Sequence, residues 1–202
     1  MELGASGRRY NQVARAEGQQ RTREALLDAA EREFFEGRFE RVSLEELAAS
    51  AGVTKQTLLR HFGSKDALLE QSASRGRGRV QAQRFGAPAG DVGRAVDNLL
   101  AHYNEDGKRA LMIDTLEGRG GVAGEIVAEA KALHYDWVDH AFGCWLERLP
   151  AGARRRRRAA LIALCDVHVW WLLSHDLGLS RADLRRTLVE AIERILIGAQ
   201  PR

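Results

Sequence analysis

The amino-acid sequence predicts an all-α protein of about nine helices. Only three of its 202 residues are proline, so few positions would interrupt a helix. Along most of the chain, apolar residues recur at spacings of three and four, which places them on one face of a helix. Residues 43–46, Ser-Leu-Glu-Glu, also match the S-x-x-E capping box that marks the start of many helices.

The predicted helices follow one another through short connections. We expect a flexible basic arm at residues 1–20, because this segment is polar and rich in Gly and Arg. A helix from residue 22 to about Gly37 would bury Leu26, Leu27 and Phe34. Further helices are expected at residues 43–51, 54–62, 64 onwards, 92–103, 109–117, 122–149, 154–175 and 180–198.

A domain boundary is expected after residue 75. Gly76 and Gly78 would each cost the interior of a helix about 1 kcal/mol, so we expect a break or a soft spot near them. Residues 86–91 have the composition of a loop. We therefore place one domain at residues 21–75 and a larger helical domain at residues 76–202.

Two of the predicted helices are short and are joined by a tight turn. Ser43 begins the first of them, and Gly52 lies where the chain must turn, since glycine reaches positive φ without a Cβ penalty. Thr54 can cap the second helix, in which Leu58 and Phe62 are four residues apart and share a buried face. This arrangement is a helix-turn-helix, which places its second helix in the major groove of DNA. The alternative is an ordinary helical hairpin with a solvated polar face.

The outward face of the second helix has side chains that suit DNA. Lys55 and Arg60 can contact phosphates or guanine edges, and Gln56 can contact adenine. Leu59 could contact the methyl group of thymine. The sequence therefore favours a DNA-reading helix over a solvated hairpin.

Residues 22–69 resemble the N-terminal domain of the TetR family of transcriptional regulators. The family pattern V-x-x-x-x-(L/I)-Y-x-(H/Y)-F is matched by Val53, Leu58, His61 and Phe62. Leu59 departs from it, because the family usually has a tyrosine there that contacts the DNA backbone. The resemblance implies that Lys65 and the backbone amides beside it hold a phosphate. The full set of predicted DNA-binding residues is Ser43, Thr54, Lys55, Gln56, Thr57, Leu59, Arg60, His61 and Lys65.

The resemblance also implies a function for the rest of the chain. Members of the family are all-helical homodimers with a larger ligand-binding and dimerising domain, which residues 76–202 would form. We therefore expect a repressor that a small molecule releases from a pseudo-palindromic, double-stranded DNA operator. The last two helices would form the dimer interface, although they could equally complete the bundle of a monomer. The alternatives are an effector-independent DNA-binding dimer and an enzyme on a helical scaffold.

Aromatic and polar side chains in residues 76–202 are candidates for an effector pocket, because such pockets combine apolar walls with a few polar groups. For any single residue, packing in the core is the more common role. The candidate ligand-binding residues are His102, Tyr103, Met112, Asp114, His134, Trp137, Phe142, Trp145, His168 and Trp171. We expect His168 to lie on an apolar face and to be satisfied in the core or across a dimer axis.

Motifs for chemistry are not evident in the sequence. It has no G-x-S-x-G, P-loop or GxGxxG motif, so we expect no catalytic residue, cofactor or enzyme activity. Asp136 and His140 are four residues apart and could share a metal ion, but no third ligand follows at a matching spacing, and we expect no metal site.

Charge and cysteine usage fit a cytoplasmic protein. The net charge of +3 is a mild bias towards polyanions, and the run Arg154–Arg158 is expected to form a solvated face. Cys144 and Cys165 are expected to be buried thiols. The N-terminus has no apolar signal segment, and no stretch of the sequence is long and apolar enough to span a membrane, so no membrane partner is expected.

Overall fold

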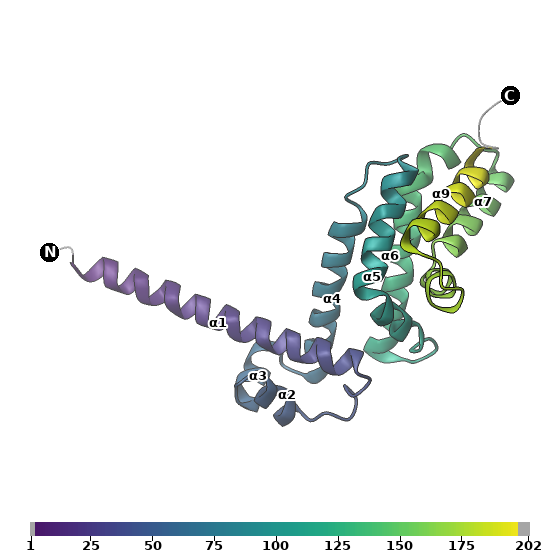
Figure 1. Ribbon diagram of the computed structural model, residues 1–202. Helices are drawn as coiled ribbons and strands as arrows, with labels where there is room; N and C mark the ends of the chain where they lie inside the picture. The colour runs from purple at the N-terminus through teal and green to yellow at the C-terminus, as the bar shows by residue number, and fades with distance from the viewer. Residues whose placement is uncertain (1–2, 198–202) are drawn as a thin grey trace. The chain divides into compact units, whose positions relative to one another are not determined.

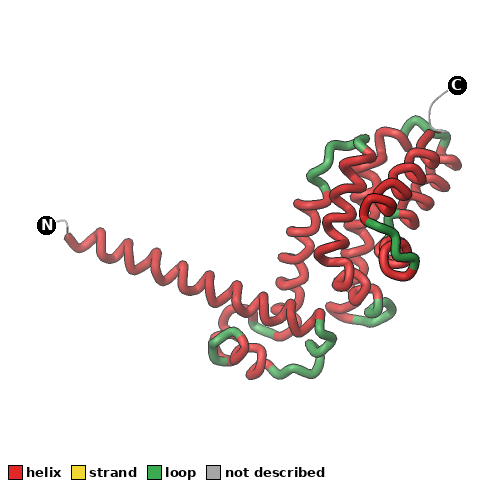
Figure 2. The backbone as a smooth tube through the Cα atoms, viewed as in Figure 1, coloured by secondary structure: helices red, strands yellow, loops and turns green. Residues whose placement is uncertain are grey.

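The computed structural model of the chain describes the backbone of residues 3–197 and the side chains of residues 13–196. Over this range all regular secondary structure is helical, which confirms the predicted fold class (Figures 1 and 2). The helices are α1 (Leu3–Phe35), α2 (Leu44–Ser50), α3 (Lys55–Phe62), α4 (Lys65–Arg84), α5 (Val92–Asp114), α6 (Gly121–Leu146), α7 (Ala151–Leu164), α8 (Val167–Trp171), the π-helical turn η1 (Leu172–Asp176) and α9 (Arg181–Ile197).

The chain forms two compact units, Met1–Gly76 and Arg77–Arg202, which we call the N-terminal and the C-terminal unit. The division lies beside the boundary expected after residue 75. Helix α4 runs through it without the break expected near Gly76 and Gly78. A helix can carry glycine at exposed or half-exposed positions when its other residues favour the helical state.

The N-terminal unit has a small core shared by its helices. Helix α2 packs against α1 and α3. The hydroxyl of Ser72 on α4 donates to the carbonyl oxygen of Leu27 on α1 at 3.1 Å. Arg75, also on α4, forms ion pairs with three carboxylates of α1 at 2.6–2.9 Å. The buried apolar side chains are Leu26, Leu27, Ala29, Ala30, Phe34, Phe39, Leu47, Ala48, Leu58, Phe62, Leu68 and Leu69.

The C-terminal unit is a helical bundle. Helix α5 packs against α6, α8 and α9, while α7 packs against α6 and α9 (Figure 1). The largest fully buried side chains of its core are Trp137, Phe142, Leu99, Leu100, Leu161, Leu188, Ile192 and Val96. This core holds in place the polar groups described below.

Three helix boundaries differ from those predicted. Helix α1 begins at Leu3, so residues 3–20 are helical rather than an irregular arm. The helices expected at residues 92–103 and 109–117 are a single helix, α5. The helix expected at residues 154–175 ends at Leu164, and α8 starts after Asp166, whose carboxylate accepts the backbone N–H of His168 at 2.8 Å. Asp166 is therefore an N-cap that separates two helices.

The thiol of Cys144 is exposed, whereas that of Cys165 is buried, so the expectation of two buried thiols was wrong for Cys144. Cys144 lies on the side of α6 that faces the loop before α5. A Cβ atom on Gly90 would be 3.0 Å from its Sγ.

The run of arginines at the start of α7 binds several parts of the C-terminal unit. Arg154 donates to the carbonyl oxygens of Glu147 and Leu149, just after the end of α6. Arg157 donates at 2.7 Å to the carbonyl oxygen of Ile195, in the last turn of α9. Arg158 and Asp139 form a two-pronged ion pair with both distances at 2.7 Å. Cationic side chains near the C-terminal end of a helix donate hydrogen bonds to its free carbonyl groups and interact favourably with the helix dipole.

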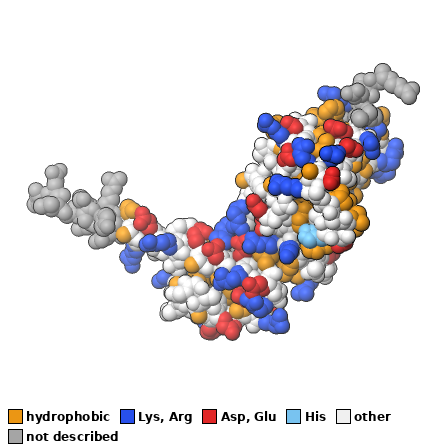
Figure 3. All heavy atoms as spheres, in the orientation of Figure 1, with side chains coloured by type: hydrophobic (Ala, Val, Ile, Leu, Met, Phe, Trp, Pro, Cys, Tyr) orange, Lys and Arg blue, Asp and Glu red, His pale blue; other side chains and the backbone are white. Residues whose placement is uncertain are grey.

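On the face drawn in Figure 3, cationic and anionic side chains are interspersed over both units. Among residues 3–197, the helices lack the combination of length and apolar character that crossing a lipid bilayer requires.

Candidate functional site

The turn between α2 and α3 is built from local hydrogen bonds that the sequence predicted. The N–H of Glu46 donates to the hydroxyl of Ser43 at 3.1 Å, and the N–H of Ser43 donates to the Glu46 carboxylate at 2.8 Å, which completes the capping box. Gly52 has φ +70° in the turn, a conformation that favours glycine. Thr54 caps α3 by accepting the N–H of Thr57 at 3.2 Å. These contacts fix where α3 begins.

Helix α3 has one buried and one accessible face, as its spacing predicted. Leu58 and Phe62 are buried, and Lys55, Gln56 and Arg60 are exposed. Thr57, Leu59 and His61 are half-buried between the two faces. Gln56, Thr57, Leu59 and Arg60 line an open depression of about 520 Å³. Four of the predicted DNA-binding side chains therefore border one accessible surface.

The two lysines predicted to bind DNA already have partners within the N-terminal unit. Lys55 forms an ion pair with Glu45 of α2 at 2.8 Å, and this hydrogen bond lowers the pKa of the Glu45 carboxyl. The ammonium of Lys65 donates to the carbonyl oxygens of Glu40 at 3.2 Å and Val42 at 2.7 Å. It also lies 4.9 Å from the ring centre of Phe39. Since an ammonium has three donors, Lys65 can stabilise the connection between α1 and α2 and still have one donor left.

In the C-terminal unit, four predicted ligand-binding residues, His102, Tyr103, His134 and Trp137, surround the buried side chain of Arg84; we call these five residues the Arg84 cluster. The Arg84 guanidinium lies 4.3 Å from the ring centre of Trp137, and its Nη2 is 3.1 Å from Nδ1 of His134. Because arginine only donates, this Nδ1 accepts, and Nε2 of His134 donates to the carbonyl oxygen of Ile162 at 3.0 Å. The indole of Trp137 donates to the Arg84 carbonyl oxygen at 3.1 Å.

Burial determines the charge state of the Arg84 cluster. It lowers the pKa of His102 to about 3, with a smaller effect from the nearby Arg84 charge. The same two causes lower the pKa of His134. Burial raises the pKa of Tyr103, whose hydroxyl donates to the carbonyl oxygen of Cys165 at 2.9 Å. At neutral pH both imidazoles and the phenol are uncharged, so Arg84 carries the charge of the cluster.

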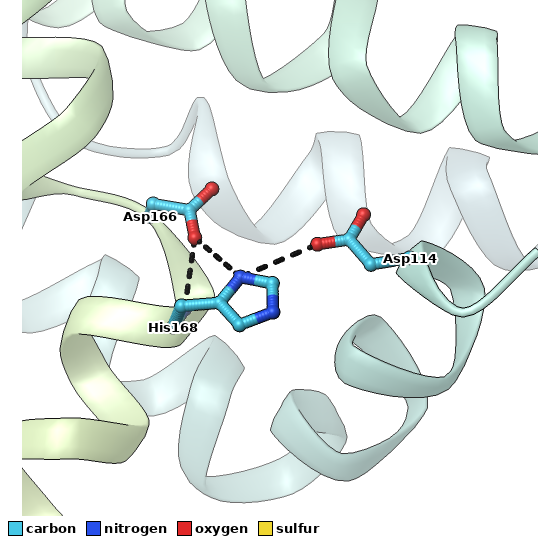
Figure 4. A group of neighbouring side chains, drawn as sticks. All are labelled: Asp114, Asp166 and His168. Carbon is cyan, nitrogen blue, oxygen red and sulfur yellow. Dashed lines mark hydrogen bonds and ion pairs between the residues drawn. The ribbon is translucent and has the colours of Figure 1, made fainter. Parts of the chain in front are cut away.

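Asp114, Asp166 and His168 converge where the end of α5 approaches the start of α8 (Figure 4). Nδ1 of His168 is 2.9 Å from Asp166 and 3.4 Å from Asp114. One ligand atom from each residue lies within 4.8 Å of the other two, a spacing that a metal ion could occupy. Burial, and then the charge of Asp166, raises the pKa of Asp114. His168 is exposed, so its expected place on an apolar face was wrong; the helix break at Asp166 turns it towards solvent.

The other predicted ligand-binding residues lie outside these two groups. Phe142 is buried, with its ring centre 5.8 Å from that of Trp137. Trp145 donates to the carbonyl oxygen of Gly90 at 3.3 Å, and Trp171 stacks on His175 at 3.8 Å. Met112 is half-buried on α5.

Sequence reasoning missed Arg84 and Asp166, whereas Trp170 was among the aromatic residues that it considered for a pocket. Nothing local distinguishes Arg84 from the other arginines of α4, because its burial depends on α5 and α6. The role of Asp166 as a helix cap could have been predicted, since an aspartate directly before an apolar run is a common N-cap. Trp170 is buried, and its ring centre lies 5.6 Å from that of Tyr103.

Comparisons with known proteins agree with this fold. Residues 26–71 match the family model of the bacterial regulatory proteins, tetR family. No curated protein shows significant similarity to the sequence.

Several solved structures share the fold over most of the chain. A TetR-family transcriptional regulator from Streptomyces coelicolor is 18% identical, with a TM-score of 0.65 over 89% of this chain and 82% of its own. A transcriptional regulator from Rhodococcus sp. Rha1 is 20% identical, with a TM-score of 0.61 over 89% and 96%. NalD of Pseudomonas aeruginosa, the secondary repressor of the MexAB-OprM multidrug efflux pump, is 21% identical, with a TM-score of 0.60 over 89% and 98%.

The family match covers the capped turn, the accessible face of α3 and the start of α4, which are the features that the sequence assigned to DNA binding. The structural neighbours extend the agreement in fold to the C-terminal unit. Residues 26–71 thus match the tetR family of bacterial regulatory proteins, and most of the chain shares the fold of TetR-family regulators of known structure.

Proposed function

We propose that the chain is a sequence-specific, DNA-binding repressor that acts as a homodimer and responds to a small molecule. The accessible face of α3 carries this proposal. Gln56 and Arg60 are exposed at a position fixed by two helix caps, where their side chains could reach base edges. The proposal involves no catalysis, and a cytoplasmic location follows from it, since the operator is genomic DNA.

Dimerisation through the last helices, as the family resemblance implies, would place two copies of α3 about one helical turn apart on DNA. Leu172 and Leu177, which lie before α9, are 46% and 62% exposed, so apolar surface is accessible there. The outer face of α9 itself is mostly charged, with Arg181, Arg186 and Arg194 exposed. The interface would therefore combine apolar contacts with ion pairs.

A small molecule would act by preferring one of two states of the dimer. Bound in the C-terminal unit, it would favour the state in which the two α3 helices cannot reach both half-sites. Helix α4 supports this route, because it is continuous from the DNA-binding domain to Arg84. The repressor role agrees with the function that its name gives to NalD.

Selection of bound sequences from a random pool of double-stranded DNA at moderate salt tests the proposal. We expect enrichment of a pseudo-palindrome whose half-sites are about one helical turn apart. Binding without enrichment, and lost as salt rises, would leave only a basic protein attracted to phosphates and would refute sequence-specific recognition.

Substitution of one arginine tests the assigned face of α3. Arg60→Ala should weaken binding to the selected DNA by about tenfold or more, because it removes one contact to a base or phosphate. Arg94→Ala removes the same charge from an exposed position in the C-terminal unit and serves as the matched control. Equal affinities of the two variants at matched salt would show that another surface binds the DNA.

A further inference from the structure

The core of the C-terminal unit contains a positive charge without a carboxylate partner. The Arg84 side chain is 4% exposed, and its guanidinium contacts the neutral groups of Trp137 and His134. Among the described residues, no carboxylate lies within ion-pair distance of it. Burial lowers the pKa of Arg84, but an arginine side chain stays protonated in a protein. A desolvated ion without a counter-ion is costly, so its presence argues for an anion that the chain does not itself supply.

Three buried nitrogen atoms near this charge have no hydrogen-bond partner: Nε of Arg84, Nδ1 of His102 and Nε1 of Trp170. All three side chains surround the ring of Tyr103. The Arg84 guanidinium lies 5.8 Å from its centre, and the rings of His102 and Trp170 lie 5.2 Å and 5.6 Å from it. Buried polar groups are normally paired, so three unpaired nitrogens around one ring indicate a place for a polar ligand group.

The nature of these nitrogens determines what they can bind. Arginine and the indole of tryptophan only donate hydrogen bonds, and neutral His102 donates from Nδ1 in one of its tautomers. A carboxylate offers two oxygens with about four acceptor sites, and it pairs with guanidinium in a two-pronged geometry. Asp166 already contributes negative charge near Arg84. A single guanidinium in this setting therefore suits a monoanion better than a phosphate dianion.

We propose that the effector of this protein is an organic monoanion whose carboxylate binds Arg84 within the Arg84 cluster. The Nε1 of Trp170 and the Nδ1 of His102 donate to the same carboxylate. The rings of Tyr103, Trp137 and Trp170 form the walls that hold an apolar body. This inference rests on the proposed response to a small molecule and specifies its chemical class.

Entry of the anion requires a shift of the segment that holds Trp170. Its ring lies directly on α5, where a Cβ atom at Gly107 would be only 2.4 Å from it. Trp170 belongs to the five-residue helix α8, which is followed by the π-helical turn η1. Such π-helical turns are frequent at functional sites. The anion would therefore select a state in which α8 has moved away from α5, which gives it a means to change the C-terminal unit.

Thermal unfolding and isothermal titration of the full chain with sodium acetate, sodium benzoate and sodium phenylacetate test the proposal. Benzamide has the ring without the charge, and sodium chloride at matched ionic strength controls for salt. We expect the acids with an apolar body to bind and to raise Tm, while benzamide and chloride do not. Arg84→Met should weaken carboxylate binding by about tenfold or more, since it removes the charge-assisted pair.

The stability of Arg84→Met without ligand gives a second readout. An unpaired buried charge replaced by an apolar side chain of similar length should leave Tm unchanged or higher. A purely structural arginine would instead give a lower Tm. If Arg84→Met fails to fold, Trp170→Phe keeps a smaller aromatic side chain at this position, removes the N–H donor, and should still weaken carboxylate binding severalfold.

The proposal fails if none of the three acids raises Tm above chloride, or if both variants bind them as the parent does. Such a failure is separable from that of the proposed function, because operator selection needs no ligand. Enrichment of a pseudo-palindrome together with no response to acids would retain the DNA-binding repressor and refute the carboxylate effector.

Discussion

Gly107 shows how a contact with a residue distant in sequence can determine which amino acid a position requires. It lies in the interior of α5, where glycine is normally unfavourable, and the Trp170 ring occupies the space of its missing side chain. From the sequence alone, the stretch around Gly107 reads as a break between two helices. The packing of Trp170 explains both the glycine and the continuous helix.

Substitution of two helical glycines should therefore have opposite effects. Gly107→Ala places a Cβ atom 2.4 Å from the ring of Trp170, and should lower the free energy of unfolding by about 1–3 kcal/mol. Gly143→Ala in α6 meets no atom within 4 Å, and should raise it by about 0.5–1 kcal/mol. Urea denaturation measures both. Equal effects would mean that Trp170 does not rest on α5.

His102 should make stability depend on pH. Its pKa in the folded protein is about 3, against 6.5 for the free group. Between these values the unfolded chain binds a proton that the folded chain does not, so stability is full above pH 6.5 and falls as the pH decreases towards 3. The loss should be about 1.4 kcal/mol per pH unit.

Urea unfolding of the parent and of His102→Leu at about pH 7.5 and about pH 5 measures this effect. Between the two pH values, the free energy of unfolding should fall more for the parent than for the variant. The difference corresponds to the one proton that His102 binds only in the unfolded chain. His134, whose pKa is also lowered, contributes the same sign in both proteins and therefore cancels in the comparison. Parallel pH profiles would place His102 in contact with solvent.

At the scale of elements, the sequence was most informative where structure is local. The capping box at Ser43, the positive φ at Gly52 and the cap at Thr54 involve residues at most three apart, and all were predictable. The boundary wrongly expected near Gly107 is absent because the distant side chain of Trp170 packs there. The boundary at Asp166 was missed because this helix cap lies inside an otherwise apolar run. Patterns of spacing identify helical faces but do not show which neighbour covers them.

The arginine run of α7 gives a prediction at this scale. Arg157→Ala should lower the free energy of unfolding by about 0.5–1.5 kcal/mol, because the carbonyl oxygen of Ile195 near the end of α9 loses its donor. Arg155→Ala removes the same charge from an exposed position and should change stability by less than about 0.5 kcal/mol. Denaturant titration of both variants distinguishes a helix-end contact from a general effect of charge.

For the whole molecule, the fold class and the helix-turn-helix could be predicted, whereas the composition of the Arg84 cluster could be predicted only in part. His102, Tyr103, His134 and Trp137 were named as candidates because they are aromatic or polar residues on helices. Arg84, which brings them together, was not, since burial of an arginine is a property of the assembled bundle.

The assembly of the molecule is testable by its mass. Sedimentation equilibrium of the full chain should give twice the 22.4 kDa of one chain at micromolar concentration, because two half-sites require two copies of α3. Leu172→Glu together with Leu177→Glu should shift the equilibrium towards the monomer, since both apolar side chains are exposed. A dimer that is indifferent to these changes would use a different surface.

In the free protein, the carboxylate of Glu45 lies beside Lys55, where a phosphate would have to replace it if Lys55 binds DNA as we propose. Any stretch of DNA bound at Lys55 would therefore compete with a group of the protein itself for this cation. The competition would weaken binding to every sequence by the same factor, but only the operator would compensate for it through contacts from Gln56 and Arg60. Shorter pauses on each wrong site would let the protein survey a chromosome faster, so a negative side chain beside the DNA-reading helix can speed the search.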